Sequence, residues 1–330
     1  MNKPSVLLLF GGGGGEHDIS KRSMQFIQDQ LKGHNLQLWI VEIHQNHCWT
    51  NAENGEVYLR KNHLLTSQHQ LIDQIDFCIP CIHGYPGETG SIQPFLEFCG
   101  IDYLGCSQEA SSLCFNKFST KLWLDKFQIP TAPFIGLLNE HNDLQRATQF
   151  YHDHQSSGVY LKASSEGSSR GVYKITHEAE INKALSNALK FSKHVIMEKA
   201  IVGRELEVAV YSMDGKWHIS WPGEIICPQS FYDFNEKYSS QSQTKIIPRA
   251  NDLDDKIFNE IKDYCHKIID ILNLKDLSRI DLFLDQKNQI YINEVNTFPG
   301  LTQISLFPQM LSQSDHSFAD FLLDKIKNQL

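Results

Sequence analysis

Regularly spaced apolar residues predict strands and helices that alternate along the first third of the chain. An apolar run at 6–10 leads into five consecutive glycines at 11–15, followed by a helical pattern at 17–31. Further apolar strands are predicted at 36–43 and 77–82. This order predicts a doubly wound α/β unit. Its first strand–loop–helix turn would place backbone N–H groups and a positive helix end in front of an anion, although a plain flexible turn is the alternative.

Two alternating apolar runs near the end of the chain, at 279–285 and 290–296, predict a β-hairpin. Asp281, Glu294 and Asn296 can then project from adjacent strands. Three hard oxygen ligands without His or Cys suit Mg²⁺ better than zinc. Magnesium held by so few protein groups takes its remaining ligands from phosphates and water, so the hairpin points to nucleotide chemistry. Acidic residues on an exposed strand face are the alternative.

The composition favours a cytoplasmic enzyme of two or three subdomains. The 330 residues are many for one compact unit, and small polar residues at 107–112 predict a linker. A formal net charge of −9 argues against a nucleic-acid partner, because a phosphate backbone requires a basic surface. The apolar stretches are too short to span a bilayer, and the N-terminus runs into a strand without the layout of a signal peptide. We therefore expect neither nucleic acid nor a membrane as a partner.

The eight cysteines are scattered, and most lie inside apolar runs. Cys78 and Cys81 form a CxxC pair, which could be a redox motif or half of a zinc site. No second CxxC completes a metal site, and a redox pair would normally open a helix. Buried, reduced cysteines on a strand are the favoured interpretation.

Lysines accompany a loop rich in glycine and serine at 163–171. Lys162 ends the strand predicted before this loop, and a helix predicted at 116–127 carries Lys117 and Lys121 on one face. Such a loop can fold over phosphates through its N–H groups and hydroxyls, while lysine supplies charge. A simple hairpin turn is the alternative for the loop.

Three further segments are candidates for ligand contact. The loop at 82–93 carries His83 and follows a strand, and α/β sheets bind ligands at the carboxyl ends of their strands. An apolar strand at 195–207 ends in polar groups, and the irregular aromatic and charged segment at 231–238 is typical of a lid over an active site. An ordinary loop histidine, an edge strand and surface aromatic packing are the respective alternatives.

These segments together resemble the D-alanine–D-alanine ligases of the ATP-grasp superfamily. The run LFGGGGGEHDIS at 9–20 is similar to the opening of that family, and the hairpin is similar to its metal-binding hairpin. The other similar blocks follow in order over nearly the whole chain, at 82–93, 159–174, 195–207, 231–238 and 301–310. Thr89, Ala163 and Arg170 depart from the usual family residues, where Asp, Pro and Val are common.

The resemblance implies an N-terminal α/β substrate domain followed by a two-part ATP-grasp fold. The substrate-binding domain would span 1–106, the central ATP-grasp subdomain with the glycine-rich loop 107–198, and the C-terminal subdomain with the ω-loop and metal hairpin 199–330. The implied assembly is a homodimer.

The implied activity is ATP-dependent ligation of two D-alanine molecules through a D-alanyl phosphate, for peptidoglycan precursor synthesis. ATP would be a cosubstrate, and two Mg²⁺ or Mn²⁺ ions the cofactor. Another ATP-grasp ligase of amino acids or dipeptides is the alternative within the superfamily, and a nucleotide-binding sensor without turnover is the alternative outside enzymes.

The resemblance also assigns roles to individual residues. Those implied in catalysis are Glu16, Ser168, Tyr238, Arg279 and Gly300. Those implied in substrate binding are His83, Ser305 and Leu306. Those implied in ATP binding are Lys117, Lys162, Glu198, Lys199, Ile201, Glu205 and Lys237. The metal ligands would be Asp281, Glu294 and Asn296. Tyr238 further favours an amine as the second substrate, because relatives that form an ester lack tyrosine at this position.

Overall fold

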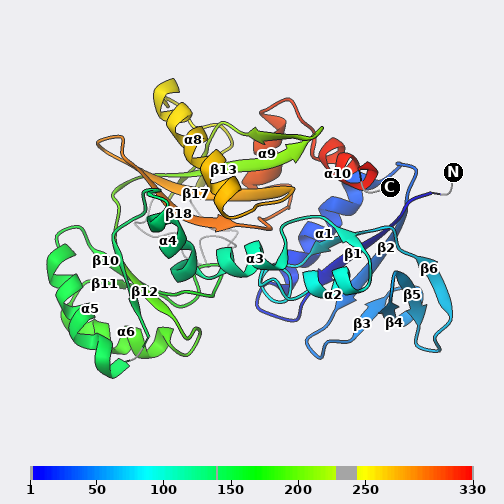
Figure 1. The fold of residues 1–330 in the computed structure, drawn as a ribbon, viewed down its shortest axis with the longest axis horizontal. Helices are drawn as coiled ribbons and strands as arrows, with labels where there is room; N and C mark the ends of the chain where they lie inside the picture. The colour runs from blue at the N-terminus through cyan, green and yellow to red at the C-terminus, as the bar shows by residue number, and fades with distance from the viewer. Residues whose placement is uncertain (1–2, 139, 228–243, 329–330) are drawn as a thin grey trace.

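A computed structural model describes residues 3–138, 140–227 and 244–328. The described strands form three sheets, which succeed one another along the chain and carry helices on their faces (Figure 1). Within these ranges, no helix is both long enough and apolar enough to cross a membrane.

The N-terminal sheet carries two helices and is built from eight strands: β1 (Ser5–Gly11), β2 (Gln37–Ile43), β3 (Trp49–Asn51), β4 (Gly55–Arg60), β5 (His63–Thr66), β6 (Leu71–Gln74), β7 (Phe77–Cys81) and β8 (Asp102–Tyr103), with α1 (His17–Leu31) and α2 (Gln93–Phe98). Strands β2, β1, β7 and β8 run parallel, and β3 to β6 extend the sheet in antiparallel fashion. Leu8 packs on the α1 side and Leu9 on the α2 side. Helices on both faces confirm the predicted doubly wound α/β unit.

Cys78 and Cys81 are buried free thiols on β7, as predicted.

The central sheet is antiparallel and lies at the lower left in Figure 1, in the order β11-β10-β12-β9. Its elements are β9 (Phe134–Leu137), β10 (Val159–Ala163), β11 (Val172–Ile175), β12 (Val195–Lys199), α5 (Glu140–His154), η1 (Glu178–Glu180) and α6 (Ile181–Ala188). Alternate residues face opposite sides of each strand, so Leu161 and Met197 pack into a core with α5 and α6. Lys162 and Glu198, one residue further along each strand, face the other side and line a cavity.

The C-terminal sheet contains the predicted hairpin. Its elements are β13 (Gly203–Met213), β14 (Lys216–Ile219), β15 (Gly223–Ile226), β16 (Lys245–Ile247), β17 (Leu277–Asp285), β18 (Ile290–Asn296) and α8 (Asp255–Ile271). Strands β17 and β18 pair antiparallel, which confirms the hairpin. Helix α8 begins after its N-cap Asp254 and packs Ile261, Cys265 and Ile268 against the sheet.

The prediction of a linker at 107–112 is wrong. Helix α3 (Gln108–Phe115) occupies most of this segment and is followed directly by α4 (Lys117–Lys126). Ser107 is the N-cap of α3 and accepts a hydrogen bond from the backbone N–H of Ala110. Ala110 and Ser111 are buried, so small residues at these positions serve helix packing.

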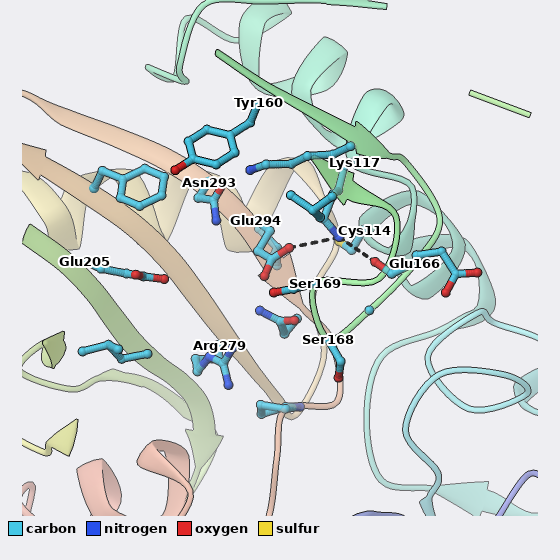
Figure 2. Close-up of a pocket in the computed structure, with 18 of the residues that line it drawn as sticks. Cys114, Lys117, Tyr160, Glu166, Ser168, Ser169, Glu205, Arg279, Asn293 and Glu294 are labelled. Carbon is cyan, nitrogen blue, oxygen red and sulfur yellow. Dashed lines mark hydrogen bonds and ion pairs between the residues drawn. The ribbon is translucent and has the colours of Figure 1, made fainter. Parts of the chain in front are cut away.

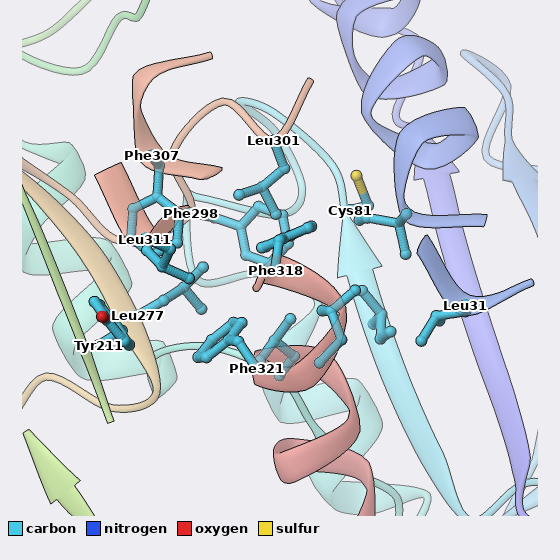
Figure 3. Close-up of a cluster of buried hydrophobic side chains, with 14 of the residues drawn as sticks. Leu31, Cys81, Tyr211, Leu277, Phe298, Leu301, Phe307, Leu311, Phe318 and Phe321 are labelled. Carbon is cyan, nitrogen blue, oxygen red and sulfur yellow. The ribbon is translucent and has the colours of Figure 1, made fainter. Parts of the chain in front are cut away.

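The last two helices, α9 (Leu306–Ser312) and α10 (Phe318–Lys327), connect the C-terminal sheet to the N-terminal one. A shared core holds Phe318 and Phe321 of α10 together with Tyr211 of β13 and Leu31 of α1 (Figure 3). Burying aromatic side chains between the two sheets fixes their relative position, since each such group stabilises by roughly 1.5–3 kcal/mol. The sheets thereby form stable walls for the cavity described next.

Candidate active site

A cavity of about 560 Å³ is lined by residues of the central and C-terminal sheets (Figure 2) and by loops that follow strands of the N-terminal sheet. Many predicted site residues line it: Glu16, His83, Lys117, Lys162, Ser168, Glu198, Lys199, Ile201, Glu205, Arg279, Glu294, Asn296 and Gly300. Asp281, Ser305 and Leu306 lie outside this lining. Lys237 and Tyr238 lie outside the described residues. The structure thus brings together side chains that are far apart in the sequence, in a volume typical of small-molecule sites.

Charged groups of the hairpin hold one another in place at one wall of the cavity. Asp281 on β17 is opposite Glu294 on β18, and Arg279 is opposite Asn296. The Arg279 guanidinium donates two hydrogen bonds of 2.7 Å to the Asp281 carboxylate, and its Nε lies 3.1 Å from Glu207. The Asn296 amide also donates to Asp281, at 3.0 Å. Such a bidentate pair orients Arg279 rigidly.

The donor set of the hairpin fits a divalent cation with a preference for oxygen. Asp281 and Glu294 offer carboxylate oxygens and Asn296 an amide oxygen, and the Glu294 carboxylate lies 3.1 Å from Lys117 Nζ, which shows that this position attracts a cation. In the described ranges, no three His, Cys, Asp or Glu side chains are grouped so as to hold a metal ion. Binding here would therefore depend on Asn296 and on oxygens from a ligand or water, as Mg²⁺ commonly does.

A buried cluster of two lysines and one glutamate lies at another wall, where Lys162 and Glu198 line the cavity and Lys121 lies outside the lining. Glu198 pairs with Lys162 of β10, and its Oε2 lies 3.1 Å from Lys121 Nζ of α4. Burial opposes the charge of Glu198, but Lys121 and Lys162 outweigh it and lower the pKa of this carboxyl to about 2. Burial lowers the pKa of Lys121, whereas Glu198 outweighs burial at Lys162 and raises its pKa. With two cations for one anion, this wall attracts a further anion such as a phosphate.

The opposite part of the cavity is acidic. The Ser168 hydroxyl of the glycine-rich loop donates a 2.5 Å hydrogen bond to Glu16 Oε1, just before α1. Glycines leave space for this carboxylate, because a Cβ on Gly84 would lie 2.8 Å from a Glu16 oxygen and one on Gly167 3.3 Å. Glu16 thereby meets one loop after β7 and another between β10 and β11, and it can accept a hydrogen bond from an ammonium group.

Glu88 and His83 lie beside Glu16. Glu88 accepts a 2.7 Å hydrogen bond from the backbone N–H of Gly84. Burial and the nearby Glu16 raise the pKa of Glu88 to about 8. The His83 ring is buried, with Nε2 2.9 Å from the Ser23 hydroxyl, and burial lowers its pKa against the opposing effect of Glu16. Both groups therefore favour their neutral forms next to the Glu16 carboxylate.

The residues before α9 form a compact turn next to the cavity. The Ser305 hydroxyl accepts a 3.0 Å hydrogen bond from the Thr302 N–H, and a Cβ on Gly300 would lie 3.0 Å from the same hydroxyl. The Leu306 side chain is buried in the core that joins the domains. Leu306 can therefore offer a ligand its backbone but not its side chain.

Sequence reasoning gave no role to Lys121 or Glu88. It placed Lys121 on one helix face with Lys117, one turn earlier, which was the available signal. Glu88 gave no such signal, because its proximity to Glu16 depends on how the loop folds.

Comparisons with known proteins cover the whole chain. The family model described as D-ala D-ala ligase N-terminus matches residues 5–106, and the one described as D-ala D-ala ligase C-terminus matches 123–327. The chain is 43% identical over 333 residues to a D-alanine–D-alanine ligase of Vibrio cholerae, covering 100% of this chain and 99% of that protein. It is 44% identical over 324 residues to the enzyme of that name from Aeromonas hydrophila, covering 98% of each.

Solved structures agree with this result. The chain is similar to the crystal structure of D-alanyl-alanine synthetase A from Vibrio cholerae, with a TM-score of 0.93, 42% identity, and coverage of 100% of this chain and 99% of that one. It also resembles VanG D-Ala:D-Ser ligase from Enterococcus faecalis, with a TM-score of 0.86 over 99% of this chain and 100% of that one. At 24% identity, the latter likeness concerns the fold alone.

Proposed function

Because the chain belongs to the D-alanine–D-alanine ligase family and has the ATP-grasp fold of that family, we propose that it joins two D-alanine molecules into D-alanyl-D-alanine while ATP is converted to ADP and phosphate. The dipeptide would serve peptidoglycan precursor synthesis. One observation carries the proposal: a single cavity combines a wall with excess positive charge and a region with excess carboxylates. The first suits a triphosphate, and the second suits the ammonium of an amino acid.

ATP binds at the cationic wall. Lys121 and Lys162, held by Glu198, supply positive charge, and the N–H groups and hydroxyls of the loop at 164–171 cover the phosphates. Lys199, Ile201 and Glu205 line the neighbouring part of the cavity and hold the adenosine through backbone and carboxylate groups. Lys237 of the ω-loop contributes a further positive charge to the γ-phosphate.

The hairpin would hold the metal. Asp281, Glu294 and Asn296 would be the ligands of Mg²⁺ or Mn²⁺, which would offset the negative charge that develops during phosphoryl transfer. Lys117 lies 3.1 Å from Glu294 and 2.9 Å from the backbone oxygen of Glu166. It thereby links the hairpin to the glycine-rich loop and brings the phosphates close to the acidic region.

The first D-alanine binds with its ammonium at Glu16. Its carboxylate takes the γ-phosphoryl group, which gives an acyl phosphate and ADP. The amine of the second D-alanine, after losing a proton, attacks the acyl carbon, and phosphate leaves. Arg279 and the N–H of Gly300 stabilise the oxyanion of the tetrahedral intermediate, and Arg279 is fixed in advance by its two hydrogen bonds to Asp281.

Other contacts position the substrates. His83 lies near the first carboxylate, and Ser305 with the Leu306 N–H receives the second. The family resemblance assigns Tyr238 a hydrogen bond to Ser168, which in turn holds Glu16. It assigns to the ω-loop the exclusion of water that would hydrolyse the acyl phosphate.

The domain organisation proposed from the sequence remains 1–106, 107–198 and 199–330, with the cavity between these parts. The matched family regions, 5–106 and 123–327, support the first boundary. We also retain a homodimer and a cytoplasmic location as proposals, on the family resemblance and the acidic composition.

The test is to measure ADP release with ATP, Mg²⁺ and D-alanine, with L-alanine, D-serine and D-lactate in parallel and mass spectrometry of the products. D-alanyl-D-alanine formed with D-alanine is the expected result. Turnover only with another acceptor would show that the protein has the activity of a different ligase of the ATP-grasp superfamily. ATP binding without ADP release would contradict an enzymatic role. Replacing Mg²⁺ by Mn²⁺ should preserve turnover, and chelation should abolish it.

A further inference from the structure

The tip of the glycine-rich loop has a backbone that needs external support. Ser168 has a φ of 50° and Ser169 a φ of 60°, both in the left-handed region that residues other than glycine rarely adopt. Such residues persist when surrounding contacts hold them. The Ser168–Glu16 hydrogen bond is one such contact, and it connects the loop to the N-terminal domain.

Arg170, next in the loop, makes a second connection to the N-terminal domain. A Cβ built on Gly15 would lie 2.9 Å from Nη1 of Arg170 and 3.7 Å from its Cζ. The same guanidinium lies 5.8 Å from the centre of the Phe191 ring, and its Nε is 3.8 Å from a Glu166 carboxylate oxygen. Arg170 therefore lies against Gly15, the residue before Glu16. On the other side, it contacts Glu166 and Phe191, which lie in the same part of the chain as the glycine-rich loop.

The absence of a side chain on Gly15 makes this approach possible. The φ of Gly15 does not lie in the left-handed region, so alanine could adopt its backbone conformation. What an alanine methyl would meet is the end of the Arg170 side chain. The neighbouring Gly14 differs, because nothing lies within 4 Å of a Cβ built there.

We propose that Arg170 is a positioning residue, which fits against the bare backbone of Gly15 and holds the glycine-rich loop in the form that brings Ser168 to Glu16. Arg170 is not among the described residues that line the cavity. Its charge therefore acts on the glycine-rich loop and on the contact with Gly15. The inference deepens the proposed function and rests on it for the activity measurement, because loop position sets how Glu16 receives the first D-alanine.

The test compares Gly15→Ala, Arg170→Val and the double variant with the unchanged protein. Gly15→Ala displaces the Arg170 guanidinium, so each single variant should raise KM for the first D-alanine by roughly two- to fivefold, the range of a partly exposed charged contact. KM for ATP and kcat should change less than KM for D-alanine. The double variant should be no worse than either single one, because both remove the same contact.

Two controls make the result specific. Gly14→Ala adds the same methyl group in open space and should leave all constants unchanged. Arg170→Lys keeps the charge but lacks the planar guanidinium, and it should recover part of the loss. Additive effects in the double variant, or an effect of Gly14→Ala equal to that of Gly15→Ala, would overturn the proposal.

Hydrogen exchange separates failure of this inference from failure of the proposed function. In the free protein, amides at 164–171 should exchange roughly two- to fivefold faster in Gly15→Ala and Arg170→Val than in Gly14→Ala. This readout does not require turnover. If the protein fails to make the dipeptide but the variants show this exchange pattern, the positioning role of Arg170 is supported and the proposed function is wrong. If the protein makes the dipeptide but the variants leave both the exchange rates and KM unchanged, only the positioning role of Arg170 is wrong.

Discussion

At one end of the cavity Glu198 lies between Lys121 and Lys162, whereas at the other end Glu16 and Glu88 lie together beside Gly84. The first cluster is buried and has one cation more than it has anions. The second has two carboxyl groups, and burial keeps one of them in its neutral form. Each end therefore carries a charge balance opposite to that of the group we propose it binds.

The two ends also differ in what would happen if a partner were lost. Lys121 is 1% exposed and Glu198 3%, so water cannot replace their ion pair. Glu16 is partly exposed and bonded to a loop hydroxyl, so water can replace part of that contact. The cationic end is thus part of the folded core, while the acidic end is adjustable. Substitutions at the cationic end should therefore lower stability, whereas substitutions at the acidic end should lower substrate affinity.

Glu198→Gln should have the largest effect, and the effect should be on stability. It leaves Lys121 and Lys162 without their counter-charge, and breaking a buried pair in this way costs about 3–5 kcal/mol. The measurement is the free energy of unfolding by denaturant. Glu16→Gln is the matched control at the acidic end, with an expected loss below about 1 kcal/mol. Equal losses at both ends would remove the distinction.

Arg279→Ala should lower kcat by about 10²–10³-fold, equivalent to about 2.7–4 kcal/mol, if Arg279 is an oxyanion donor fixed in advance. The bidentate bonds to Asp281 and the contact with Glu207 give it one orientation. Steady-state rates at saturating ATP and D-alanine measure the effect. Arg279→Lys retains a charge without the fork geometry and should lose activity as well. Full activity in the lysine variant would show that charge alone suffices.

Glu16→Gln should raise KM for the first D-alanine by about 10- to 100-fold, because a hydrogen bond to a charged group contributes about 1.5–3 kcal/mol. KM for ATP should stay close to its original value, since the nucleotide binds at the other end. Asp18→Asn is the matched control, an exposed carboxylate in the first turn of the same helix. A parallel rise in KM for ATP would mean that the two ends do not act separately.

The sequence allowed the hairpin and the N-terminal α/β unit to be predicted because their signals are periodic and local. Helix α1 begins and ends where the apolar pattern predicts, and Asp281 faces Glu294 as the alternation requires. The failures depend on tertiary contacts. Ser111 is buried by neighbouring elements that local composition cannot reveal, and Glu88 acquires its raised pKa from a residue far away in the chain.

Glu88→Gln should change the pH dependence of stability rather than its value at low pH. The folded pKa of Glu88 is raised to about 8 from 4.5, so the folded state binds more protons than the unfolded state between these values. Stability contributed by this group is therefore fully present below about pH 4.5 and is lost as pH rises towards 8. The slope cannot exceed about 1.4 kcal/mol per pH unit for one proton. Glutamine, which resembles the neutral acid, should remove this fall.

Denaturant unfolding at intervals from pH 5 to roughly pH 8 tests this expectation. Glu53→Gln, at an exposed position, should leave the slope unchanged. Glu198 does not interfere, because its folded pKa of about 2 confines its contribution to more acidic conditions. Parallel curves for Glu88→Gln and the unchanged protein would mean that Glu88 is already ionised at neutral pH. The acidic end would then hold two negative charges before any amino acid arrives, and its charge balance would attract an ammonium group more strongly than a single carboxylate can.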